Sequence, residues 1–158
     1  MGCAEAYNRL GQHYIFSYDE DDPQKAREYH LKAGEMGYAL AYTDLAWSFT
    51  REYIFSDNDY EKAREYYRKS GELGYGKAYW ILGKMYEYGE EVEKDYTQAR
   101  DYYLKGVELN DGDCCYYLGE LYYRGLGVEK DKEQAEKYCQ MGLELGCEAP
   151  EVRRIFFK

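Results

Sequence analysis

Apolar and polar positions alternate along this 158-residue chain with the period of an amphipathic α-helix. In one stretch, small or apolar residues fall at positions i, i+3, i+4, i+7 and i+10, namely Ala63, Tyr66, Tyr67, Ser70 and Leu73. Side chains with this spacing share one face of a helix, which packs that face against a neighbour. No uninterrupted apolar run exceeds five residues. A membrane-spanning helix needs roughly 20, so we expect no membrane segment.

The helical pattern occurs in four copies. A short segment recurs at steps of 37, 36 and 36 residues, as Lys25–Tyr29, Lys62–Tyr66, Gln98–Tyr102 and Gln134–Tyr138. A leucine followed by Gly or Ala recurs in the same register at Leu10, Leu45, Leu82 and Leu118. Four residues before each leucine is a small side chain that we expect to pack, namely Ala6, Ala41, Ala78 and Cys114. A fixed period of this length is typical of stacked helical repeats.

Each copy is predicted to form two helices. An aspartate precedes each second helix and is expected to accept hydrogen bonds from its first turn, at Asp22, Asp59, Asp95 and Asp131. Gly37, Gly74, Asn110 and Gly146 then end the second helices, because Gly and Asn tolerate a left-handed backbone. We therefore predict one solenoid domain over 1–158 with repeats at 1–37, 38–74, 75–110 and 111–146. Residues 147–158 are predicted to form a C-terminal capping helix, with an exposed partner-seeking tail as the alternative.

The fourth copy has a distinctive motif, Cys114-x3-Leu118-Gly119-x2-Tyr122-x2-Gly125-x-Gly127-Val128-x2-Asp131-x3-Ala135-x2-Tyr138. This motif resembles the Sel1-like repeat, a relative of the tetratricopeptide repeat. The third copy matches nearly as well, with Glu91 in place of the second loop glycine, while the first two copies have different loops at 16–22 and 51–59. The resemblance implies an all-α protein, a right-handed α-solenoid superhelix that serves as a scaffold for other proteins.

A helical wheel at 100° per residue places further side chains opposite the packed side of each first helix. In tetratricopeptide relatives the equivalent positions line the concave wall, so we predict a partner-binding concave face. Its residues are Asn8, Gln12, Phe16, Thr43, Trp47, Arg51, Trp80, Lys84, Glu87, Tyr88, Tyr116, Glu120, Tyr123 and Arg124, and the same register adds Ile15 and Thr50. Trp, Tyr and Arg commonly anchor protein interfaces. The alternative for Trp47 and Trp80 is packing between neighbouring first helices.

Charge narrows the class of partner. The chain has 31 acidic and 21 basic residues, for a net charge of −10. This charge repels a phosphate backbone, so we expect no nucleic acid partner. It favours a basic protein or peptide, and an alternative function is therefore an acidic inhibitor or immunity-type protein that neutralises a basic partner. The acidic loop residues Glu90, Glu91 and Glu93 are also consistent with simple solvation.

We find no catalytic or metal-binding motif. The chain has only two histidines, His13 and His30, and His30 occupies the repeat position held elsewhere by Tyr67, Tyr103 and Cys139. We therefore expect His30 to be a packing ring, and we expect a non-enzymatic protein without cofactor or metal. No residue of the sequence selects an oligomeric state.

The five cysteines include no CxxC pair, and the first fifteen residues lack a secretory signal, so we expect reduced thiols and a cytoplasmic location. A secreted, cysteine-rich branch of the family that this chain resembles has been linked to β-lactam binding and hydrolysis, and it has a disulfide within each repeat. Val107 and Leu143 occupy the position of the first bridging cysteine here. A β-lactam hydrolase is thus only a second alternative.

Overall fold

The computed structural model describes residues 2–16, 22–50 and 59–147, and every regular element in these ranges is an α-helix. The helices are α1 (Gly2–Phe16), α2 (Pro23–Glu35), α3 (Ala39–Ser48), α4 (Tyr60–Glu72), α5 (Gly76–Tyr88), α6 (Tyr96–Glu108), α7 (Gly112–Arg124) and α8 (Lys132–Glu144). The predicted all-α fold class is confirmed. The predicted capping helix and Arg51 lie outside the described residues, apart from Cys147 at the start of that segment, and the side chain of Phe16 is not described.

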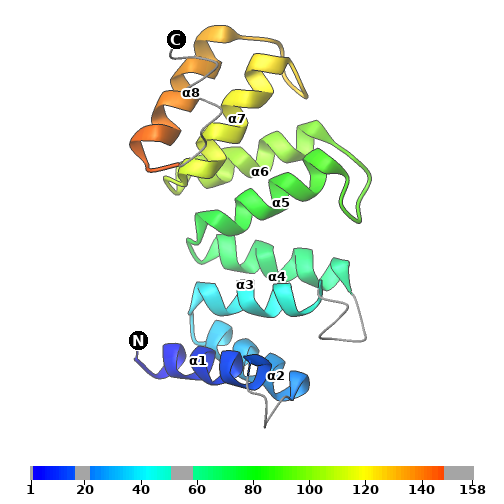
Figure 1. The fold of residues 1–158 in the computed structure, drawn as a ribbon, viewed down its shortest axis with the longest axis vertical. Coiled ribbons are helices and arrows are strands. Elements are labelled where there is room, and N and C mark those ends of the chain that lie inside the picture. Colours follow the sequence, from blue (N-terminus) through cyan, green and yellow to red (C-terminus); the bar gives the residue numbers. More distant parts are fainter. Residues whose placement is uncertain (1, 17–21, 51–58, 148–158) are drawn as a thin grey trace. The chain divides into compact units, whose positions relative to one another are not determined.

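The helices form two compact units, which we describe separately. Unit 1 covers residues 1–75 and contains α1 to α4, and unit 2 covers residues 76–158 and contains α5 to α8. Within each unit the helices pack in chain order as antiparallel neighbours (Figure 1), and in unit 2 α5 also contacts α7. We call α1, α3, α5 and α7 the first helices and the others the second helices. None of the described helices is long and apolar enough to span a membrane.

The predicted helix boundaries are confirmed by their caps. The carboxylates of Asp22, Asp59, Asp95 and Asp131 accept hydrogen bonds from first-turn backbone N–H groups at 2.8 to 3.1 Å. Such a cap stabilises a helix by about 1 kcal/mol. After the second helices the chain turns at residues with positive φ, namely Gly37, Gly74, Asn110 and Gly146.

Tyrosines form much of the contact between the two helices of a repeat. In every repeat a ring from the first helix, or from the residue that caps its C-terminus, stacks on a tyrosine of the second helix. The pairs are Tyr14–Tyr29, Phe49–Tyr66, Tyr86–Tyr102 and Tyr122–Tyr138, with ring centroids 5.5 to 5.8 Å apart. Tyrosine suits such a position because it can bury its ring and keep its hydroxyl near water.

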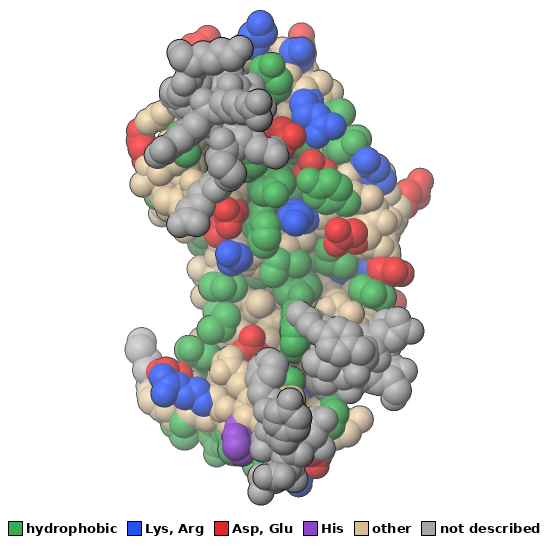
Figure 2. All heavy atoms as spheres, in the orientation of Figure 1, with side chains coloured by type: hydrophobic (Ala, Val, Ile, Leu, Met, Phe, Trp, Pro, Cys, Tyr) green, Lys and Arg blue, Asp and Glu red, His purple; other side chains and the backbone are tan. Residues whose placement is uncertain are grey.

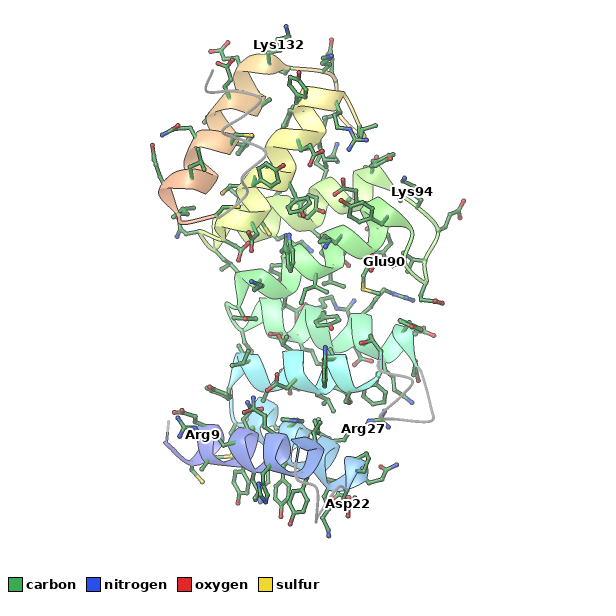
Figure 3. All side chains as sticks on the ribbon, viewed as in Figure 1. Arg9, Asp22, Arg27, Glu90, Lys94 and Lys132 are labelled. Carbon is green, nitrogen blue, oxygen red and sulfur yellow. The ribbon has the colours of Figure 1, made fainter. Side chains whose placement is uncertain are left out.

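A buried arginine also joins consecutive helices in unit 1. Arg27 of α2 reaches the carboxyl end of α3 (Figure 3), where its Nε donates to Ser48 Oγ at 3.1 Å and its Nη2 to the Ser48 carbonyl at 3.0 Å. Its guanidinium also lies over the Phe49 ring, 4.0 Å from the centroid. The hydrogen bonds satisfy a carbonyl that the helix end leaves without an intrahelical partner.

The first repeat departs from the predicted packing register. Ala6 was expected to pack, but it is exposed and Leu10 is 37% exposed, whereas Ala4 is buried. In α3 the equivalent residues Ala41 and Leu45 are buried. Cys114, the equivalent residue of α7, lies against Gly106 of the preceding helix α6, whereas no described helix precedes α1. The prediction for Ala6 was therefore wrong because it assumed a neighbour on that side.

Candidate partner-binding face

In unit 1 the predicted binding face surrounds a cavity of about 300 Å³. Three predicted residues line this cavity, namely Gln12 of α1 and Thr43 and Trp47 of α3, together with Ile15. The remaining lining residues are His30 of α2 and Asp44 of α3. We call this space the Asp44 cavity. Its walls thus come from three consecutive helices of one unit.

A polar network occupies one wall of the Asp44 cavity. Asn8 Nδ2 and Gln12 Nε2 both donate to Asp44 Oδ2, at 2.9 and 2.8 Å. With its amide nitrogen committed to Asp44, Asn8 presents Oδ1 to His30 Nδ1 at 2.8 Å. An amide oxygen only accepts hydrogen bonds, so His30 Nδ1 is the donor and has the proton. In the neutral ring Nε2 is then an acceptor.

His30 is fully buried, and its Nε2 has no hydrogen-bond partner among the described residues. Burial lowers the pKa of this imidazole, and the nearby Asp44 carboxylate opposes that shift. Burial disfavours the charged form of a histidine, so the ring is held neutral. An unpartnered buried acceptor costs about 1–3 kcal/mol unless another group donates to it.

In unit 2 the predicted face combines exposed rings and charges. Tyr88 at the end of α5 is 52% exposed, and the Lys84 ammonium lies 5.7 Å from its ring centroid. On α7 the exposed Arg124 pairs with Glu120 at 3.2 Å, and Tyr123 is half-buried. Figure 2 shows hydrophobic side chains gathered over α5 and α7, with charged side chains among them. This surface has both aromatic and ionic groups available for contact.

Three predicted residues are buried instead of facing outward, namely Asn8, Glu87 and Tyr116. Glu87 is 3% exposed and accepts a hydrogen bond from Tyr103 Oη at 2.7 Å, and burial raises the pKa of its carboxyl group. Tyr116 packs against Tyr117 and Cys139. A helical wheel includes only one helix, so it treats the outward side of each first helix as exposed to solvent. In the structure, neighbouring first helices and the following second helix cover part of that side.

The two tryptophans are both half-buried. Trp80 contacts Tyr117 of α7 at a centroid distance of 6.1 Å, and its Nε1 is buried without a hydrogen-bond partner among the described residues. Lys84 lies over its ring at 4.8 Å from the centroid. Trp80 therefore packs between neighbouring first helices, as the alternative prediction states, while Trp47 lines the Asp44 cavity.

The buried cysteines are not activated nucleophiles. All five are free, and Cys114, Cys115 and Cys139 are buried. Burial raises the pKa of Cys115 to about 11 and that of Cys139 to about 12. A thiol with such a pKa stays protonated near neutral pH, and the thiolate is the reactive form. In the described part of the chain no three His, Cys, Asp or Glu side chains are grouped to hold a metal ion.

The sequence reasoning missed Asp44 and treated His30 as packing alone. His30 departs from the repeat pattern in the first copy, and Asp44 departs from it in the second. His30 occupies the position of Tyr67, Tyr103 and Cys139, and Asp44 the position of Arg9, Ile81 and Tyr117. The available signal was an imidazole and a carboxylate in neighbouring repeats, at positions that the third and fourth copies fill with uncharged apolar or aromatic residues.

The comparisons with known proteins agree with the repeat pattern. The Sel1 repeat model matches residues 4–38, 39–75, 76–111 and 112–147, which together cover most of the chain. Among curated proteins, none matches the sequence.

Solved structures of several repeat proteins are similar to this chain. A Sel1 repeat protein from Oxalobacter formigenes is 27% identical over 90% of this chain and 58% of its own, with a TM-score of 0.74. The uropathogenic Escherichia coli protective antigen c5321, which displays an SLR fold, is 26% identical over 90% of this chain and 31% of its own, with a TM-score of 0.77. Cysteine rich protein B of Helicobacter pylori is 33% identical over 85% of this chain and 95% of its own, with a TM-score of 0.65. This chain thus spans less than two thirds of the first two proteins, and the shared fold is an all-α solenoid.

Proposed function

Because the chain belongs to the Sel1 repeat family, whose members generally take part in protein–protein interactions, we propose that it is a non-enzymatic adaptor that binds a protein or peptide. The binding surface is the outward side of the first helices within each unit. In unit 1 it centres on Gln12, Thr43 and Trp47, and in unit 2 on Lys84, Tyr88 and Arg124.

One observation supports this proposal above others. The rings that hold a repeat together are stacked between its two helices, but Tyr88 is 52% exposed and Trp47 only half-buried. Large aromatic side chains that the repeat does not need for packing are typical interface anchors. The surrounding surface provides both signs of charge, which gives specificity and orientation to a protein complex.

The acidic character favours a basic partner in the cytoplasm. With a net charge of −10 the chain attracts positively charged proteins over distances of about a Debye length, or ~8 Å at physiological ionic strength. The same charge disfavours nucleic acid and anionic membrane surfaces. No cofactor or metal takes part in the proposed binding.

The test compares partner capture by variants of the two aromatic anchors, Trp47 and Tyr88. Trp47→Ala combined with Tyr88→Ala is expected to lose the proteins that the wild type retains from a source lysate. The matched control is Met36→Ala combined with Leu109→Ala, since these residues are 48% and 37% exposed but lie at the ends of second helices. Circular dichroism checks that both variants keep their helicity. Equal capture by both double variants would contradict the proposal.

A second candidate function rests on the same net charge. An acidic inhibitor or immunity-type protein would bind one basic toxin or enzyme, and its association rate would fall steeply with added salt. A stopped-flow series with the captured partner from 20 to 500 mM salt tests this candidate. A steep fall supports it, and a nearly constant rate would count against it. Turnover of a chromogenic β-lactam would overturn both and favour the hydrolase alternative.

A further inference from the structure

The Asp44 cavity combines two hydrogen-bond acceptors with an aromatic wall. His30 Nε2 is buried and has no partner among the described residues, and it belongs to a ring that lines the cavity. Asp44 provides a carboxylate, and Trp47 and Ile15 provide apolar surface. The proton on His30 Nδ1 is fixed by Asn8, so Nε2 stays an acceptor. Among the described residues, His30 Nε2 therefore lacks a donor.

The charge of Asp44 is also left uncompensated. Its two hydrogen-bond donors, Asn8 and Gln12, are neutral amides, and no cation among the described residues forms an ion pair with it. The adjacent imidazole is held neutral by burial. A carboxylate beside a buried acceptor is best complemented by a group with several N–H donors and a positive charge.

The corresponding part of unit 2 shows that the fold does not need this cavity. In the repeat register Asn8, His30 and Asp44 correspond to Trp80, Tyr103 and Tyr117. Tyr117 contacts both of the other rings, with centroid distances of 6.1 Å to Trp80 and 5.6 Å to Tyr103. Unit 2 thus fills with aromatic rings the position at which unit 1 has polar groups around an open space.

We infer that the Asp44 cavity binds a cationic side chain, an arginine or lysine, of the partner protein. The N–H groups of the side chain donate to Asp44 and to His30 Nε2, and its methylene groups lie against Trp47 and Ile15. An indole face adds attraction for the cation, and long basic side chains commonly bury their methylene groups while their charged ends find partners. A volume of about 300 Å³ has room for such a side chain. The affinity of the cavity for a cation is independent of the proposed function. Only the assignment of that cation to a partner protein rests on the proposed function.

The experiment uses small probes, so that it does not depend on the partner. Butylguanidinium and butylammonium represent arginine and lysine side chains, and butylurea is the neutral control of similar shape. Each is titrated into the full-length chain labelled with ¹⁵N, and the Trp47 indole, the backbone amides of residues 43–47 and the His30 Nε2 resonance are followed. The two cations are expected to shift these signals, and the arm with the lower dissociation constant identifies the preferred side chain.

Variants connect the signal to the named groups. Asp44→Asn keeps the side-chain shape but removes the charge, and it is expected to weaken cation binding roughly tenfold, the effect of losing one charge-assisted hydrogen bond. Glu136→Gln removes one charge from an exposed position of unit 2 and is expected to leave binding unchanged. His30→Tyr places in the cavity a ring that other copies have at this position and is expected to abolish binding.

Each outcome bears on the inference. Selective shifts by the cations, lost in Asp44→Asn and retained in Glu136→Gln, support it. Equal shifts by butylurea would overturn it in favour of an unselective apolar cavity, and an absence of shifts with all three probes would overturn it in favour of a solvent-filled space. If the probes bind but capture of the partner does not depend on Trp47 and Tyr88, the cavity stands and the proposed adaptor surface fails.

Discussion

The hydrogen bond between Tyr103 and Glu87 provides a sharp test of the packing. Tyr103 is fully buried, and its Oη donates to Glu87 Oε2 at 2.7 Å. Tyr103→Phe keeps the ring and removes only the hydroxyl, so the main loss is one hydrogen bond to a buried charged group. Such bonds contribute about 1.5–3 kcal/mol. We predict that the free energy of unfolding decreases by about 2 kcal/mol, which lowers Tm by roughly 4–8 °C.

The assay is urea unfolding at pH 7 and pH 4, followed by far-UV circular dichroism. Burial raises the pKa of Glu87, so on acidification its carboxylate gains a proton before most other acids do. The bond then becomes neutral, and the loss caused by Tyr103→Phe is predicted to shrink to about 1 kcal/mol. The titration of Glu87 also has its own effect on stability. Because its pKa is higher in the folded chain, protonation of Glu87 stabilises the fold at low pH, and this stabilisation is lost as the pH rises through the raised pKa.

A double-mutant cycle with Glu87→Leu isolates the pair. Once the carboxylate is removed, Tyr103→Phe is expected to cost little, because neither partner is then left unsatisfied. Additive effects of the two substitutions, or a loss below about 0.5 kcal/mol for Tyr103→Phe alone, would refute this reasoning. Glu87 would then be a surface residue, as the helical wheel predicted.

Three further predictions concern His30, the third-repeat loop and Arg27. Burial lowers the pKa of His30 below its ordinary 6.5, so the free energy of unfolding should fall as the pH drops below that value, by at most about 1.4 kcal/mol per pH unit. Urea titrations from pH 7.5 to 5 should show a smaller pH dependence in His30→Tyr, and identical slopes would contradict the assignment. Glu91 has a φ of 55°, and the equivalent residue of the fourth repeat is Gly127, with a φ of 64°. Because a left-handed backbone is strained for a residue with a side chain, Glu91→Gly should raise the free energy of unfolding by about 1 kcal/mol in thermal melts. A decrease would count against backbone strain at Glu91. Arg27→Met keeps an unbranched side chain but removes the hydrogen bonds to Ser48 of α3. Denaturant unfolding should show that the free energy of unfolding falls by about 2 kcal/mol. An unchanged free energy of unfolding would show that these bonds do not stabilise the fold.

The helices, their caps and the repeat register could be predicted from the sequence, because each depends on local spacing. The aspartate four residues before each repeat alanine and the Gly or Asn at each second-helix end fix the boundaries within a single turn of chain. The tyrosine stacks follow from the same register, since both rings of a pair belong to one repeat.

Contacts between neighbouring repeats could not be predicted in the same way. Whether Glu87 is exposed depends on Tyr103 of the second helix and on α7 alongside α5, and a wheel for one helix includes neither. The Asp44 cavity depends on the difference in size between His30 and the tyrosine at the same position in other copies. Asn8 is likewise buried because Asp44 and His30 offer it partners from two other helices.

¹⁵N-amide NMR of the 158-residue chain, with and without the captured partner, tests whether the outward side of the first helices binds a protein. We expect the largest signal changes at residues 12–15, 43–47 and 84–88. Changes confined to the ends of the second helices, around Met36, Leu73 and Leu109, would show that a protein binds elsewhere.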